Sequence, residues 1–139
     1  MDQNTIAIFH ECSAGSIAET LNFPGVLAKL VAAGAEGYHC DLYRREKTYY
    51  LPDGSSHVEP EPELDPHEFG GAHIAHRFSE EDIKAALRAV QNGAATYVQF
   101  LRRIMAAGCV GYTVNLPGRR ALYFSRRAEV YVEPFPAGN

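Results

Sequence analysis

The strongest constraint on the fold is that this sequence contains one pattern twice. Residues 23–60 align without a gap with residues 97–134, at a constant offset of 74 positions (97 − 23). Composition alone would produce about two or three identities over such a length. The alignment has twelve: Leu27/Leu101, Ala32/Ala106, Ala33/Ala107, Gly34/Gly108, Gly37/Gly111, Tyr38/Tyr112, Leu42/Leu116, Arg45/Arg119, Tyr49/Tyr123, Val58/Val132, Glu59/Glu133 and Pro60/Pro134. Such a match predicts a duplicated structural unit.

Each copy begins with a predicted helix. Asn22 and Thr96 are residue types that cap helix N-termini, and Pro24 suits the first helical turn of the first copy. Apolar residues then recur at helical spacing. Gly34 and Gly108 follow, and glycine readily adopts the left-handed conformation that ends a helix.

A three-stranded meander is predicted after each helix. Alternation places Tyr38, Cys40 and Leu42 on one side of the first strand. Short turns then lead to "KTYYL" and "SHVEP" in one copy, and to "ALYFS" and "VYVEP" in the other. The last strand of each copy ends at Pro60 or Pro134, because proline cannot continue a hydrogen-bonded ladder.

A further helix is expected before each repeated segment. "SEEDIKAALRAVQNG" has Ser79 as its cap and closes at Gly93. Its counterpart, "TIAIFHECSAGSIAETL", is less regular, and we expect a break near Gly15. The predicted fold is α+β, two helix-helix-meander units with their helices packed on an antiparallel sheet. The predicted organisation is a single domain (1–139), with halves 4–60 and 79–136 joined by a Pro/Gly/His-rich linker (61–78).

Composition excludes several classes of protein. The net charge of −4 disfavours a dedicated nucleic-acid binder, although "RRALYFSRR" (119–127) leaves an anion-binding or nucleic-acid-binding patch as an alternative to a solvated strand pair. No apolar run approaches the roughly 18 residues of a membrane span, and the polar N-terminus lacks signal-peptide features, which favours the cytoplasm. The three cysteines show no CxxC spacing and are expected to be buried apolar residues.

The second half resembles a known family. The residues that carry the resemblance are "FSEEDIKAALRAVQNG", the helix-to-strand junction "FLRRIMAAGCVGYTVNL", the aromatic strand that follows, and "VEP". They are similar to the YdfO-like family of small bacterial and prophage-associated proteins, sometimes labelled phage envelope proteins. The resemblance covers 79–136 directly and 23–60 through the repeat. It implies an α+β fold and supplies no activity or catalytic residues. The histidines of "AHIAHRF" depart from the family pattern.

The stretch "YHCDL" (38–42) places histidine, cysteine and aspartate side by side. Neighbours in a strand point to opposite faces, so Cys40 is predicted to face the core while His39 and Asp41 share the other face. His57 and Glu59 also share one face of their strand. We therefore consider a single face that holds His39, Asp41, His57, Glu59 and Tyr49. The alternative is a polar sheet surface that faces solvent.

The linker adds further histidines and an aspartate: Asp65, His67, His73 and His76. The HxxH spacing is compatible with metal ligation, with Asp65 as an oxygen ligand. The alternative is a loop that is rich in histidine and binds no metal. If the linker folds over the first meander, His73 or His76 would join His57 and Glu59 in a proton-transfer site. "FGG" matches no nucleotide-binding loop.

Two functional classes follow. The first is cofactor-independent acid–base chemistry on a small organic molecule, such as isomerisation, cyclisation or dehydration. The second is a non-catalytic interaction protein that works through its sheet or through 119–127, and it includes the possibility of a homodimer. In the first class the predicted acids, bases and hydrogen-bond donor are His57, Glu59, Asp41, His73, His76 and Tyr49, and Tyr38, His39 and His67 bind the substrate.

Overall fold

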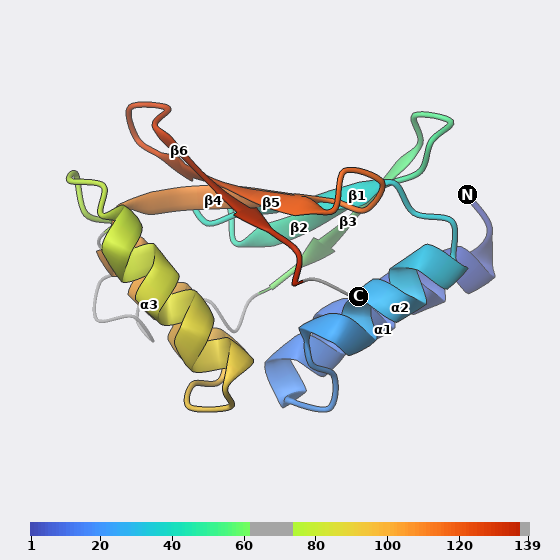
Figure 1. Cartoon of the computed structure of the whole chain (residues 1–139). Coiled ribbons are helices and arrows are strands. Elements are labelled where there is room, and N and C mark those ends of the chain that lie inside the picture. Colours follow the sequence, from blue (N-terminus) through green and yellow to red (C-terminus); the bar gives the residue numbers. More distant parts are fainter. Residues whose placement is uncertain (62–73, 137–139) are drawn as a thin grey trace.

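The computed structural model describes residues 1–61 and 74–136, and within these residues the chain folds into two layers. One layer is a six-stranded antiparallel sheet in the order β3-β2-β1-β4-β5-β6, and four helices form the other layer on a single face of it (Figure 1). The helices are α1 (Gln3–Ala18), α2 (Phe23–Ala32), α3 (Glu80–Gln91) and α4 (Tyr97–Ala106). The strands are β1 (Gly37–Asp41), β2 (Glu46–Tyr50), β3 (Ser56–Pro60), β4 (Cys109–Asn115), β5 (Arg120–Ser125) and β6 (Val130–Pro134). The predicted α+β class is confirmed.

The predicted helix signals are confirmed at three of the four helices. Asn22 accepts a hydrogen bond from the backbone of Gly25, and Ser79 accepts one from the backbone of Asp82. Thr96 forms a full capping box at the start of α4. After α2 and α4 the chain turns at Gly34 and Gly108, whose φ angles of 77° and 92° lie in the left-handed region.

The predicted break in the first helix is wrong. α1 runs without interruption past Gly15 to Ala18, and Glu19 caps its end with a φ of 62°. Gly15 has a packing role, because a Cβ atom there would lie 2.7 Å from Cδ1 of Leu21, where the chain turns back toward α2. Its carbonyl accepts hydrogen bonds from the backbones of Thr20 and Leu21. The glycine permits the tight turn after the helix without breaking it.

The strand register has two-fold symmetry. β1 and β4 are antiparallel neighbours at the centre of the sheet, where Gly37 pairs with Asn115 and Asp41 pairs with Gly111. Exchanging every residue with the one 74 positions away leaves this pairing unchanged, and it maps the pair His39–Thr113 onto itself. A local two-fold axis therefore passes between His39 and Thr113. The pairings of β1 with β2 and of β2 with β3 recur, shifted by 74, in β4 with β5 and β5 with β6.

The turns follow the same relation. Arg45 and Arg119 occupy equivalent positions and both adopt positive φ angles, 56° and 52°. The carbonyl of Arg45 accepts a hydrogen bond of 2.9 Å from the backbone of Glu61, and that of Arg119 accepts one of 2.9 Å from Phe135. Each hairpin turn thus anchors the residue that follows the third strand of its own half.

Two repeated glycines allow the central strands to pair. A Cβ atom on Gly37 would collide with the carbonyl oxygen of Val114, and one on Gly111 would lie 2.7 Å from the carbonyl oxygen of Cys40. These two contacts are equivalent under the local two-fold axis. The recurrence of glycine at both positions therefore has a physical cause, the close approach of β1 and β4.

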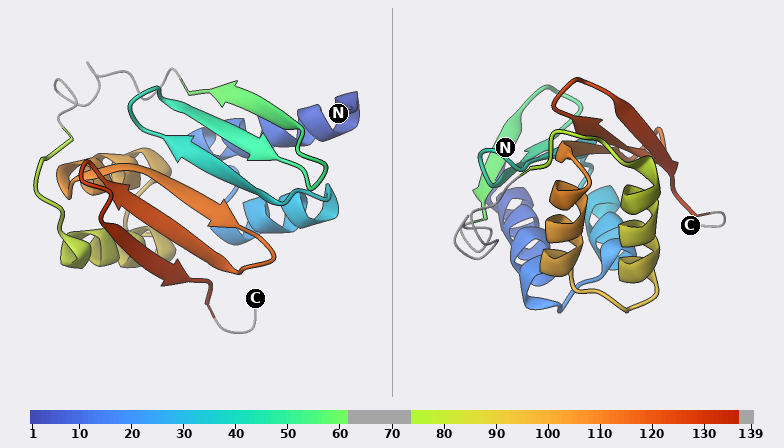
Figure 2. Two further views of the ribbon diagram at one scale, coloured as in Figure 1. Left: turned by 90° about the horizontal axis from the view of Figure 1, so that it is seen from above. Right: turned by 90° about the vertical axis from the view of Figure 1, so that its left-hand side faces the viewer.

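The two faces of the sheet differ in burial. The face toward the helices carries the core, including Tyr38, Cys40 and Tyr49 from the first half, and Tyr112 and Tyr123 from the second. Seen from above, the other face has no helix over it (Figure 2). We call it the open face. None of the described helices is long and apolar enough to cross a membrane.

Candidate functional site

The predicted catalytic residues do not share one face of the sheet, so that prediction is wrong. Tyr49 pairs with Tyr38 on one side and with His57 on the other, which places all three on the face toward the helices. His39 pairs with Thr48 and Thr113, and lies on the open face. Each pair of neighbours was assigned correctly within its own strand. The register between strands decides which faces coincide, and short-range alternation contains no information about it.

A carboxylate between two imidazoles forms where α1 passes under β3. Nδ1 of His10 lies 2.8 Å from Oε1 of Glu59, and Nε2 of His57 lies 2.6 Å from Oε2 of the same carboxylate. Glu59 and His57 are largely buried, with side-chain exposures of 12% and 24%, whereas His10 is 72% exposed. The cluster therefore lies at the rim of the helix layer, with one imidazole toward solvent.

Aromatic packing fixes the inner side of this cluster. The Phe9 ring stacks on the Tyr49 ring with centroids 4.6 Å apart, and its centroid is 6.3 Å from that of His57. Tyr49 is fully buried and shares a hydrogen bond of 2.7 Å with the hydroxyl of Ser13. Burial holds the pKa of Tyr49 far above its usual range. Tyr49 therefore supports the cluster and does not reach a ligand, and the same burial separates Tyr38 from solvent.

The equivalent glutamate in the second half has different partners. Oε2 of Glu133 accepts a hydrogen bond of 2.7 Å from Arg88 on α3, and Oε1 accepts one of 2.6 Å from the hydroxyl of Tyr131. Burial alone would disfavour the charge of Glu133, but these donors outweigh it and lower its pKa. Burial and Glu133 together raise the pKa of Tyr131 to about 12. The equivalent glutamates therefore have different partners: an arginine and a tyrosine hydroxyl in the second half, and two imidazoles in the first.

The two remaining candidates on β1 have structural roles. The carboxylate of Asp41 accepts hydrogen bonds from the backbones of Tyr43 and Arg44, at 3.0 and 3.1 Å, and so shapes the first hairpin turn. Nδ1 of His39 lies 2.7 Å from the hydroxyl of Thr113. Burial lowers the pKa of His39, against the opposing effect of Asp41. Neither residue contributes to the cluster around Glu59.

Of the linker candidates, His76 lies within the described residues. Asp65, His67 and His73 lie outside the described residues. His76 is exposed, next to a segment that packs on the fold through buried Ile74. Across 1–61 and 74–136, no group of three His, Cys, Asp or Glu side chains gathers in a way that would hold a metal ion. The ligand set of Asp65, His73 and His76 stays a prediction, because two of its members lie outside the described residues.

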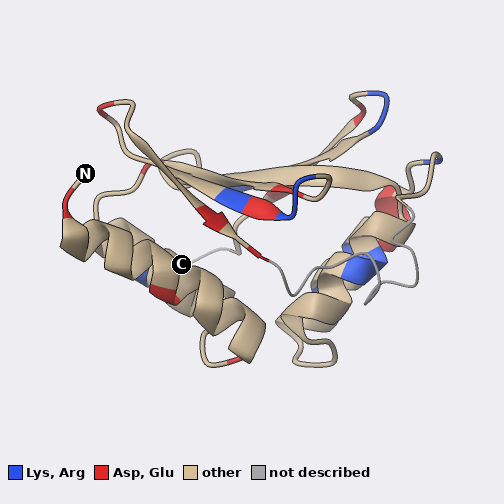
Figure 3. Cartoon of the chain, turned by 180° about the vertical axis from the view of Figure 1, so that it is seen from behind, with Lys and Arg blue, Asp and Glu red and all other residues tan. Residues whose placement is uncertain are grey.

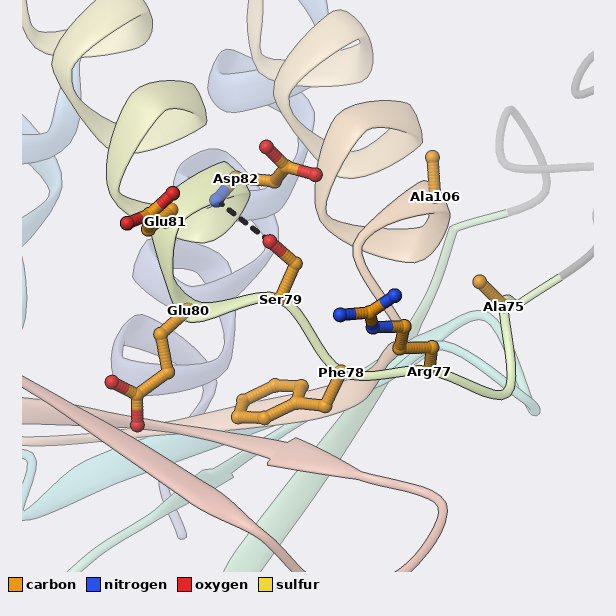
Figure 4. Close-up of a pocket in the computed structure, with 8 residues that line it drawn as sticks. All are labelled: Ala75, Arg77, Phe78, Ser79, Glu80, Glu81, Asp82 and Ala106. Carbon is orange, nitrogen blue, oxygen red and sulfur yellow. Dashed lines mark hydrogen bonds between the residues drawn. The ribbon is translucent and has the colours of Figure 1, made fainter.

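A shallow hollow of about 440 Å³ lies at the start of α3. Its polar lining consists mainly of Arg77, Ser79 and three acidic residues of the first helical turn (Figure 4). These carboxylates complement the helix dipole, and the Ser79 hydroxyl is used in the helix cap. Among the described residues, none of the predicted catalytic side chains lines the hollow.

A buried ion pair lies deeper under the first half. Lys47 and Glu61 have side-chain exposures of 2% and 1%, with Nζ of Lys47 3.5 Å from Oε1 of Glu61. The ammonium also lies 4.5 Å from the ring centroid of Tyr97 and 5.4 Å from that of Tyr38. Aromatic faces stabilise a desolvated cation. The ion pair therefore has a specific cage formed by β1, β2 and α4.

The second half has no such pair at the equivalent positions, which hold Ala121 and Phe135. Phe135 instead packs edge-to-face on Phe23, with centroids 5.7 Å apart. The counterpart of Phe23 is Tyr97, which covers Lys47. The fully buried lysine–glutamate pair is thus specific to the first half.

The cysteines have no reactive environment. All three are buried, as predicted, and burial raises the pKa of the Cys12 and Cys109 thiols to about 11. Burial also raises the pKa of Cys40 well beyond the usual range. Thiolate is the nucleophilic form of cysteine, so burial and a raised pKa both disfavour a nucleophilic role for these thiols.

Sequence reasoning missed three residues, His10, Lys47 and Glu61. His10 is 49 positions from Glu59, and no local pattern connects them. Lys47 could have been found more easily than His10, because alternation places it on the same face as Tyr49. A lysine on a core-facing position predicts a buried acidic partner.

Comparison with known proteins adds no identification. No protein-family model matches the chain, and no curated protein matches it.

Proposed function

We propose that this chain is a protein-interaction module whose working surface is the open face of its sheet. The observation that carries the proposal is an uncharged row of side chains across all six strands. Strand pairing places Val58, Thr48, His39, Thr113, Leu122 and Val132 side by side in that order. At the ends of the row Val58 is 45% exposed and Val132 is 42% exposed. A sheet face that lacks charge along its middle and exposes apolar side chains at both ends has features typical of protein interaction sites.

The distribution of charge supports the proposal. Charged residues of the sheet lie toward strand ends and turns (Figure 3). On the open face Asp41 is engaged by the turn that it caps, and Glu46 pairs with Arg44 at 2.7 Å. The middle of the face is flanked by Tyr50, Phe124 and Val130. The partner that fits is therefore a flat, uncharged protein surface, such as another sheet.

Site-specific photo-crosslinking in the producing cell tests this function. A benzoylphenylalanine residue at Val58 or Val132 is expected to give a covalent adduct with the same partner protein. The matched control is Val31 on α2, which is 64% exposed but lies outside the sheet. Adduct formation at Val31 as strong as at the two sheet positions, or none at any of them, would contradict the proposal.

A second candidate function is proton transfer at His10, Glu59 and His57. It is favoured by the contact of the Glu59 carboxylate with both imidazoles, at hydrogen-bond distance. A carboxylate partner orients an imidazole and stabilises its protonated form. Such a site would perform the cofactor-independent isomerisation, cyclisation or dehydration expected above. Its small organic substrate would approach from the exposed side of His10.

Hydrolysis of p-nitrophenyl acetate, a general probe of activated imidazoles, tests this second candidate. His57→Gln and Glu59→Gln are expected to lower the initial rate by about tenfold or more. His39→Gln, on the opposite face, is the matched control and keeps the wild-type rate. Equal rates in all three variants would remove the catalytic candidate.

We also propose that the two halves arose by duplication, and that the chain is a YdfO-like protein of the cytoplasm. Its support is the constant offset of 74 in both sequence and strand register. The family resemblance rests on the motif residues of the second half alone.

A further inference from the structure

We infer that the partner of the open face is a second copy of this chain, which packs sheet against sheet in a four-layer homodimer. This inference rests on the proposed function of the open face and identifies its partner. The helices would form the two outer layers. The uncharged rows of the two copies would meet in the middle. Three properties of the face support a second copy as the occupant.

The first property is symmetry. The local two-fold axis between His39 and Thr113 is perpendicular to the sheet, so the open face looks nearly the same after half a turn. Suppose that a two-fold axis parallel to the strands places a second copy face to face with the first. Because each copy has its own local two-fold axis, a two-fold axis across the strands then relates the two copies approximately as well. In both arrangements Val58 and Val132 lie opposite valines. The uncharged row of one copy therefore meets the uncharged row of the other in either arrangement.

The second property is the position of the charges on the face. In the two face-to-face arrangements, Asp41 of one copy lies opposite Gly37 or Gly111 of the other. Glu46 and Arg120 each lie opposite Tyr50 or Phe124, because strand pairing places these residues in mirrored rows. No like charges on the described strands meet, and Arg120 faces an aromatic ring, a favourable contact for a cation.

The third property is area. Six strands about 4.8 Å apart, each with at least five residues at about 3.3 Å, cover a rectangle of about 29 by 17 Å. Two copies would therefore cover about 990 Å² in projection, and more in accessible surface because side chains stand up from the sheet. Biological interfaces begin at about 1,000 Å² in total. The area fits a weak, reversible dimer. Twisted sheets pack in this way about 10 Å apart.

Sedimentation equilibrium of the purified chain tests the inference. We expect a reversible equilibrium between a 15.3 kDa monomer and its dimer in the micromolar range. The double variant Val58→Lys/Val132→Lys places four lysines in the dimer interface, and should weaken dimerisation by about 100-fold or more. Val31→Lys makes the same change on a helix and should leave the dissociation constant unaltered. Far-ultraviolet circular dichroism and thermal melting of dilute samples verify that the variants are folded.

A chain that sediments as a monomer up to about 300 µM, well above the expected micromolar range, would overturn the inference, and so would a dimer that the double variant leaves intact. These failures are distinguishable from failure of the proposed function. If Val58 and Val132 crosslink to a different protein in the cell while the purified chain is monomeric, the open face is an interaction site and only its partner is wrong. Adducts of about twice the chain mass support both.

Discussion

Replacing Lys47 by alanine is expected to lower the free energy of unfolding by about 3–5 kcal/mol. The substitution removes the ammonium that lies 3.5 Å from the carboxylate of Glu61, at a site where both side chains are almost fully buried. Removing one partner of a buried ion pair leaves the other charge in a medium that solvates it poorly. It also empties the space between the rings of Tyr38 and Tyr97. Urea denaturation at pH 7 measures the loss.

The double variant Lys47→Ala/Glu61→Phe is expected to recover most of that stability, to within about 1 kcal/mol of the wild type. It installs the residues that the second half has at these positions, Ala121 and Phe135. A phenylalanine at position 61 would pack on Tyr97 as Phe135 packs on Phe23. Buried ion pairs are often replaceable by well-packed apolar residues, since their attraction is largely offset by desolvation.

A surface ion pair is the control for this experiment. Lys29 on α2 lies 2.9 Å from Glu11 on α1, and both side chains are substantially exposed. Lys29→Ala is expected to cost less than about 1 kcal/mol. If Lys47→Ala costs no more than Lys29→Ala, the ion pair does not stabilise the fold. If the double variant is as unstable as the single one, Lys47 acts through its packing and not through its charge.

The sequence was sufficient to predict most of the secondary structure, because its signals are local. Caps at Asn22, Ser79 and Thr96 and glycines at the ends of α2 and α4 each act within a few residues. The repeat added the expectation that both halves share one fold. The exception was Gly15. Glycine is typical of a helix break, but here it allows close packing against Leu21.

The candidate site was less predictable, because it depends on contacts between distant segments. Alternation correctly paired His57 with Glu59, and His39 with Asp41, on shared faces. It could not decide that the two pairs lie on opposite faces, since that depends on which residues of β1 and β2 are neighbours. The contact between His10 and Glu59 requires the placement of α1 against β3, which no sequence pattern encodes.

The two halves differ in the polar side chains that face the helices. The two copies share a backbone register, but Lys47, Glu61 and His57 replace Ala121, Phe135 and Tyr131. These differences gather polar groups under the first half, while the open face keeps a row of uncharged residues in both. The helix-facing side therefore differs in its buried polar groups between the halves, whereas the middle row of the open face is uncharged in both.

The close approach of the central strands leads to the second large effect. Gly37→Ala is expected to lower the free energy of unfolding by about 3 kcal/mol, because its methyl group would collide with the carbonyl oxygen of Val114. The neighbour is backbone in a paired strand, and it cannot move aside as a flexible side chain would. Relief requires β1 and β4 to separate, and within the described residues this pairing is what joins the two meanders into one sheet. Thermal and urea unfolding measure the effect.

The local symmetry sharpens this prediction. Gly111→Ala places a methyl group 2.7 Å from the carbonyl oxygen of Cys40 and should cause a similar loss. The two substitutions push the same pair of strands apart, so the double variant should lose less stability than the sum of the single ones. Gly54→Ala is the control, because the glycine has a φ of 88° and open space around it. It should cost only the conformational penalty of about 1–2 kcal/mol. A loss at Gly37 no larger than at Gly54, or strict additivity of Gly37→Ala and Gly111→Ala, would show that β1 and β4 accommodate the methyl groups independently.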